Sequence, residues 1–157
     1  MVERTLTSPK ENRMSKDYVA QASVTIQAQA DKVWSALTDP AVIRQYMFGT
    51  HVISDWKKGS PIIWRGEWEG KAYEDRGLVL TYERNRRLRY SHYSPVAGEI
   101  EMPGMYHTVT IELSEKRGRT VVSLMQDNNA TRQAKSESEK NWTTMLAGLK
   151  QLMESRS

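Results

Sequence analysis

The C-terminal part of the chain limits the possible folds more than any other segment. Residues 141–153 read NWTTMLAGLKQLM, with apolar side chains recurring three and four positions apart. That spacing places one group on a single stripe of an α-helix: Trp142, Met145, Leu146, Leu149, Leu152 and Met153. Lys150 and Gln151 fall on the other side. Such a helix needs an apolar surface to cover, which is either a solid core or the wall of a pocket.

Much of the remaining chain alternates between apolar and polar residues, as half-buried strands do. We expect a first strand around 18–26, two short helices at 30–37 and from Pro40 to Gly49, and then strands at 51–56, 61–68, 71–83, 88–93, 107–113 and 120–126. Residues 94–104 are predicted to be a loop. Short turns between successive strands require an antiparallel sheet. A terminal helix of about 22 residues would span about 33 Å, enough to cross several strands. The prediction is an α+β fold with a curved antiparallel sheet of six to seven strands around this helix.

Length and composition indicate one soluble domain. With 157 residues, we interpret 1–16 as a polar, flexible tail and 17–157 as a single domain. No apolar run approaches the ~20 residues of a membrane span, and the N-terminus lacks the apolar core of a secretory signal. The chain has no cysteine, which excludes disulfides and thiolate metal sites. Together these features favour a cytoplasmic protein.

The basic residues do not predict a nucleic-acid partner. The net charge is +4, and the densest cluster lies in ERNRRLRY, at Arg84, Arg86, Arg87 and Arg89. This cluster has two interpretations, a phosphate-binding patch or a hairpin turn at Asn85. The turn is favoured, because no aromatic or glycine-rich binding motif accompanies it.

Several polar side chains fall on strand faces that are otherwise apolar: Glu74, Arg76, His92, His107 and Gln126. An unpaired buried polar group costs a few kcal/mol, so these side chains either lie beyond the rim of the sheet or face a wet pocket. A rim salt bridge explains Glu74 and Arg76 equally well, and the histidines suit a satisfied core or edge position. No nucleophile elbow, phosphate loop, dinucleotide motif or acidic pair for a metal is present, so no cofactor, metal or catalytic residue is assigned.

Four segments in order resemble the SRPBCC (START-like) superfamily, in the AHSA-type branch related to the activator of a heat-shock-protein ATPase. They are VTIQAQADKVWSALTDPAVIRQY, GLVLTYERNRRLRY, HTVTIELSEKRGRTVVSLMQDN and NWTTMLAGLKQLM, and the resemblance covers roughly residues 18–154. It implies a helix-grip (birch-pollen-allergen-like) fold whose sheet and helix enclose a cavity. Tyr46 stands where many relatives carry Trp, and Gln126-Asp127-Asn128 also departs from the pattern. The identity of a ligand therefore does not carry over.

The resemblance and the inward aromatic side chains together predict a site for a small apolar or aromatic molecule. Its predicted lining is Trp64, Trp68, Glu74, Arg76, Leu78, Leu80, Tyr90, His92, His107, Val109, Gln126, Trp142, Met145, Leu146 and Leu149. The favoured function is a carrier, sensor or scavenger rather than an enzyme. The alternatives are a cyclase or aromatase-like enzyme, with acid–base candidates among His92, His107, Glu74 and Arg76, and a protein that stimulates a chaperone ATPase. A monomer or a homodimer is expected.

Overall fold

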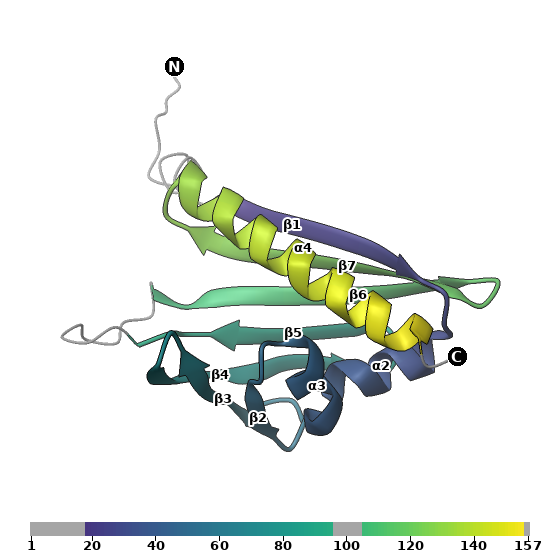
Figure 1. Cartoon of the computed structure of the whole chain (residues 1–157), viewed down its shortest axis with the longest axis horizontal. Helices are drawn as coiled ribbons and strands as arrows, with labels where there is room; N and C mark the ends of the chain where they lie inside the picture. Colours follow the sequence, from purple (N-terminus) through teal and green to yellow (C-terminus); the bar gives the residue numbers. More distant parts are fainter. Residues whose placement is uncertain (1–17, 96–104, 156–157) are drawn as a thin grey trace.

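One antiparallel sheet organises the chain (Figure 1). The structure is a computed structural model that describes residues 18–95 and 105–155. Its elements are β1 (Tyr18–Ile26), α2 (Ala30–Thr38), α3 (Pro40–Tyr46), β2 (His51–Ser54), β3 (Pro61–Trp68), β4 (Lys71–Glu83), β5 (Arg87–His92), β6 (His107–Lys116), β7 (Arg119–Asn129) and α4 (Arg132–Ser155). The strand order is β1-β7-β6-β5-β4-β3-β2, and every neighbouring pair is antiparallel. The predicted fold class and element order are confirmed.

The predicted tail (1–16) and residues 96–104 of the predicted loop lie outside the described residues. The arginine cluster surrounds the turn between β4 and β5, where Asn85 has φ of +68°. The turn interpretation of this segment is therefore confirmed. None of the helices in 18–95 and 105–155 is long and apolar enough to cross a lipid bilayer.

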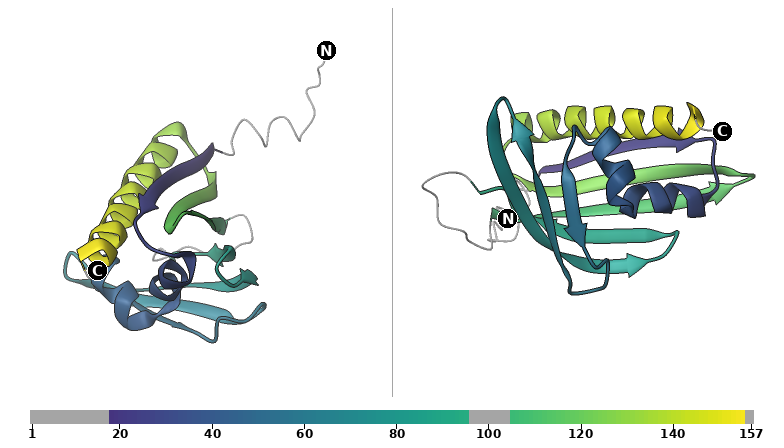
Figure 2. Two further views of the ribbon diagram at one scale, coloured as in Figure 1. Left: turned by 90° about the vertical axis from the view of Figure 1, so that its right-hand side faces the viewer. Right: turned by 60° about the horizontal axis from the view of Figure 1, so that its bottom comes forward.

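The apolar stripe of α4 packs against the inner face of the sheet. Met145, Leu146 and Leu149 are at most 4% exposed, and the predicted flanking members of the stripe are partly buried. Figure 2 shows the sheet curving round the space beneath α4, while α2 and α3 close one end of that space. The helix therefore covers a curved surface and does not stand apart from it.

Side chains of α4 also cover the free edge of β1. The carboxylate of Glu139 accepts a hydrogen bond from the backbone amide of Gln21 at 3.0 Å, and that of Glu154 accepts one from Gln27 at 2.9 Å. The ammonium of Lys150 donates to the carbonyl of Thr25 at 2.7 Å. Unpaired strand edges attract other strands, so these contacts both hold the helix and shield the edge.

The inner face of β4 differs from the prediction because the strand contains a β-bulge. The register shifts between Val79 and Thr81, and this shift moves later side chains to the opposite face. Upstream of the bulge the inward residues are Tyr73, Asp75, Gly77 and Val79. Gly77 marks a close approach of two strands, since a Cβ there would overlap the carbonyl oxygen of Ser91.

The acidic side chains at the β1 edge predict an acid-sensitive part of the stability. The pKa of Glu139 is lowered by the amide of Gln21 and then by Lys135, and that of Glu154 by Lys150 and then by the amide of Gln27. A lowered folded pKa adds stability above the unfolded value, about 4.5, and this stability is lost as the pH falls through the folded value. Urea unfolding from pH 6 down to pH 3 should therefore show a smaller loss of stability in Glu139→Gln/Glu154→Gln than in the wild type.

Glu137→Gln is the matched control, because Glu137 is exposed on the same helix and its carboxylate accepts a hydrogen bond of 3.5 Å from Gln133 of that helix. It should follow the pH dependence of the wild type. An identical pH dependence in the double variant and the wild type would show that the edge contacts contribute nothing to stability.

Candidate functional site

A small cavity lies where the sheet, α3 and α4 meet. Its volume is about 30 Å³. The lining is almost wholly apolar and aromatic: Leu37, Ile43, Tyr46, Met47, Val52, Trp56, Trp64, Leu88, Tyr90, Ile111, Trp142 and Met145. Pockets for small ligands usually measure roughly 300–1,000 Å³, whereas this space has the size of one or two water molecules. A larger molecule would enter only if lining side chains moved.

Two hydrogen-bond donors in this lining have no acceptor. Tyr90 is 7% exposed, and its hydroxyl makes no hydrogen bond with any described residue. Burial raises the pKa of Tyr90 well above its usual range, so the hydroxyl keeps its proton. The indole Nε1 of Trp56 is also buried without a partner in the described ranges. By contrast, the hydroxyl of Tyr46 donates to the carbonyl of Ala36 at 2.8 Å.

Larger hollows elsewhere on the described part of the molecule have no buried, unpaired hydrogen-bond donor in their lining. One, of about 870 Å³, is an open groove beside α2 and the C-terminal end of α4, and another lies on the outer face of β1, β7 and β6. Neither is lined by any of the described polar atoms that are buried without a partner. The small cavity is therefore the stronger candidate for a binding site.

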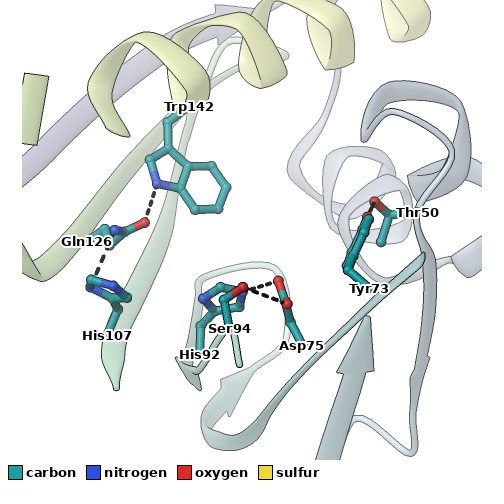
Figure 3. A network of polar contacts seen from close by, with 8 residues as sticks. All are labelled: Thr50, Tyr73, Asp75, His92, Ser94, His107, Gln126 and Trp142. Atoms are coloured by element: carbon teal, nitrogen blue, oxygen red, sulfur yellow. Dashed lines mark hydrogen bonds and ion pairs between the residues drawn. The ribbon is translucent and has the colours of Figure 1, made fainter. Parts of the chain in front are cut away.

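A histidine held by a carboxylate lies on the inner face of the sheet (Figure 3). Asp75 Oδ2 is 2.9 Å from His92 Nε2, and Asp75 Oδ1 accepts a hydrogen bond of 2.9 Å from the hydroxyl of Ser94. The inward turn of Asp75 follows from its position upstream of the β4 bulge. Both side chains of this hydrogen-bonded pair are mostly buried, with 27% of the His92 side chain and 16% of the Asp75 side chain exposed.

The aromatic side chain of Trp64 connects this pair to the cavity. Its ring lines the cavity and lies 5.0 Å from the ring centre of His92, edge to face. The same indole is 5.3 Å from the ring centre of Tyr90. One indole therefore contacts both the carboxylate-held imidazole and the apolar space.

A second polar group surrounds His107 and joins the sheet to α4. His107 Nδ1 is 2.8 Å from the carbonyl oxygen of Asp127, and Trp142 Nε1 donates to Gln126 Oε1 at 2.7 Å. The Gln126 amide nitrogen lies 3.2 Å from Asn129 Oδ1. Figure 3 shows this group and the Asp75 group on the same side of the sheet, with Trp142 extending from α4 toward them. The His92 and His107 rings are 6.4 Å apart.

The partners of the two imidazoles fix their neutral tautomers. A carboxylate and a carbonyl oxygen only accept hydrogen bonds, so the protons lie on His92 Nε2 and on His107 Nδ1. The Gln126 amide nitrogen, 3.5 Å from His107 Nδ1, then faces another donor and makes no useful bond to it. His92 Nδ1 and His107 Nε2 remain as acceptors with no partner among the described residues.

Most of the residues predicted from the sequence do lie on the inner side of the fold. They are Trp64, Tyr90, His92, His107, Val109, Gln126, Trp142, Met145, Leu146 and Leu149, of which Trp64, Tyr90, Trp142 and Met145 line the cavity itself. Within 18–95 and 105–155, no three His, Asp or Glu side chains gather closely enough to hold a metal ion.

The face predicted for part of β4 and the position predicted for Trp68 are wrong. Glu74 and Arg76 face outward, Leu78 is 46% exposed, and Leu80 lies at the bulge. Glu74 pairs with Arg65 at 2.7 Å, which is a salt bridge of the exposed rim type. Trp68 is 61% exposed at the tip of the β3–β4 hairpin, where it contacts Phe48. The prediction assumes that Leu78, Leu80 and Tyr82 lie on one face of a regular strand. The bulge between Val79 and Thr81 instead changes which face of β4 points inward.

Sequence reasoning missed Asp75, Ser94 and Trp56. The signal for Asp75 was Gly77, since an isolated glycine within a strand often marks a bulge or a close backbone approach. Ser94 lies outside the strands. Trp56 was predicted to end a strand at 51–56, but β2 ends at Ser54, so the alternating pattern did not place either side chain.

The architecture, a curved antiparallel sheet that grips one long helix, defines an SRPBCC-type domain. Residues 27–154 match the family described as Activator of Hsp90 ATPase homolog 1-like protein, and the chain belongs to this family. A comparison with curated proteins found no match.

Solved structures agree with this assignment. The solution structure of ChR145 from Cytophaga hutchinsonii is 49% identical, with a TM-score of 0.78 over 88% of this chain and 95% of that one. MLL2253 from Mesorhizobium loti is 21% identical with a TM-score of 0.71, over 89% and 99% of the two chains. The Aha1 dimer from Colwellia psychrerythraea is 18% identical with a TM-score of 0.65, over 85% and 93%. The latter two likenesses concern the fold alone.

The tautomers of the two inner histidines can be tested by ¹⁵N NMR of the imidazole rings. In the neutral form, His107 should carry its proton on Nδ1, unlike free histidine, which favours Nε2–H. His92 should show an Nε2–H proton protected from exchange, and Asp75→Ala should remove that protection. The exposed His51 serves as the internal reference and should behave like free histidine. An Nε2–H form at His107 would contradict its hydrogen bond to Asp127.

Proposed function

We propose that the space between the sheet and α4 binds a small planar aromatic molecule that carries an oxygen acceptor. The observation that supports this most is the indole Nε1 of Trp56, which is buried in the cavity lining without a partner among the described residues. A buried donor without an acceptor costs about 1–3 kcal/mol. A ligand oxygen would remove that cost, and it could also accept a hydrogen bond from the Tyr90 hydroxyl, which makes none with any described residue.

The lining is suited to adapting its shape. The present space of about 30 Å³ is too small for an aromatic ring, so binding requires displacement of side chains. Met145 of α4 and Met47 after α3 are flexible and fit varied shapes. Trp142 is only half-buried and lies at the side nearest the polar groups. These side chains form the wall that would move, while the strands form the fixed wall.

An enzyme acting in the same space is the second candidate, and the Asp75–His92 pair favours it. A carboxylate that orients an imidazole is a common arrangement for general acid–base catalysis. Of the acid–base candidates in the sequence, Glu74 and Arg76 face the outside of the sheet and have no access to this space. His92 and His107 remain.

The role of Tyr90 can be tested with 4-nitroanisole, a planar probe with acceptor oxygens and no acidic proton. The probe should quench tryptophan fluorescence and raise the melting temperature of the wild type. Tyr90→Phe should weaken binding about 2- to 13-fold, since a hydrogen bond is worth about 0.5–1.5 kcal/mol. The same substitution should not lower the stability of the free protein, because the hydroxyl has no partner to lose.

Tyr82→Phe is the matched control with the opposite expected pattern. The hydroxyl of Tyr82 accepts a hydrogen bond of 3.0 Å from Trp34 Nε1 and lies away from the cavity lining. Its removal should lower stability by about 1 kcal/mol and leave probe binding unchanged. Wild-type protein that binds neither 4-nitroanisole nor other planar aromatic probes would refute the proposed function.

A further inference from the structure

We infer that the Asp75–His92 pair is a proton-accepting end of this site, and that the ligand carries an acidic hydroxyl, a phenol or an enol. The inference rests on the proposed function, because it needs a ring bound beside Trp64. It adds the chemical class of the ligand and a role for two residues that packing alone does not explain.

The first step concerns the free nitrogen of His92. Its Nε2 is committed to Asp75 at 2.9 Å, and its Nδ1 has no partner among the described residues. A neutral imidazole in this tautomer offers a lone pair at Nδ1 and no proton there. A purely apolar ligand would leave that lone pair unpaired, whereas a hydroxyl group would donate to it.

The second step concerns the charge after proton transfer. Both oxygens of Asp75 are held, one by His92 and the other by Ser94, so the carboxylate cannot easily turn away. When Nδ1 accepts a proton, the positive imidazolium lies next to this fixed negative charge. The titratable side chains around His92 are Asp75 on β4 and His107 on β6, whose ring centre is 6.4 Å away.

The third step places a ring beside the imidazole. Trp64 lines the cavity and contacts His92 at the same time. A planar molecule packed against this indole would therefore have its apolar part in the cavity and its polar substituent toward His92. In the transfer itself the ligand O–H bond breaks, an N–H bond forms at Nδ1, and the electron pair stays on the ligand oxygen. No electron donor or acceptor is needed.

The test compares 4-nitrophenol with its methyl ether 4-nitroanisole, in which a methyl group replaces the acidic proton on the oxygen. The nitrophenolate ion is yellow and the neutral phenol is nearly colourless, so absorbance reports where the proton lies. At a pH one unit below the pKa of free nitrophenol, the bound probe should absorb as phenolate. We expect nitrophenol to bind at least about tenfold more tightly than nitroanisole, equivalent to about 1.4 kcal/mol.

His92→Gln should abolish both the phenolate absorbance and the preference for nitrophenol, while nitroanisole still binds and so shows that the variant is folded. Asp75→Asn should reduce the phenolate signal, because it removes the negative charge behind the imidazole. His51→Gln is the matched control, since His51 is an exposed imidazole on β2, and it should behave as the wild type.

The outcomes separate the two proposals. If neither probe binds the wild type, the proposed function fails. If both bind with equal affinity and the bound nitrophenol stays neutral, the proton-accepting role is refuted and the binding function stands. A phenolate signal that persists in His92→Gln, or that is lost only in His107→Gln, would also overturn the assignment to His92.

Discussion

Burial of the α4 stripe against a curved sheet is the interaction on which the other features depend. Met145, Leu146 and Leu149 are almost fully buried, and each such side chain contributes about 1.5–3 kcal/mol relative to exposure. The same packing positions Trp142 above the sheet, where its indole reaches Gln126. Without α4 in place, the inner histidines would face open water and the apolar lining would have no second wall. The helix therefore creates the fold and the environment of the site together.

The β4 bulge gives that environment its chemical diversity. A regular strand would present one face throughout, but the register shift lets β4 contribute Asp75 upstream and Tyr82 downstream to the inner side. Asp75 then meets His92 of β5, and Tyr82 instead meets Trp34 of α2. An apolar space with unpaired donors thus borders the hydrogen-bonded pair of Asp75 and His92. Such a border between a dry and a polar region suits molecules with an apolar ring and a polar substituent.

The order of elements and the buried stripe could be predicted, because periodicity reports burial directly. The stripe from Trp142 to Met153 is unbroken, and so is the alternation in β1 after Ala20, in β6 up to Leu113 and in β7 up to Gln126. In β4 the alternation fails, since the pattern of Leu78 and Leu80 has no mark of the bulge except Gly77. Trp68 shows a second limit of the sequence pattern. Alternation along β3 does not reveal that Trp68 lies at the hairpin tip, where it is exposed. The Asp75–His92 contact joins two strands, and no spacing along one chain encodes it.

The shielding of β1 has a consequence for how the protein can associate. With Gln21, Thr25 and Gln27 engaged by α4, strand addition on that side would first require breaking intramolecular bonds. The opposite border of the sheet, β2, is only a short strand from His51 to Ser54. Any growth of the sheet into a larger assembly is therefore directed to one border and limited to a few backbone pairs. The same helix that closes the interior therefore also blocks strand addition at the β1 edge.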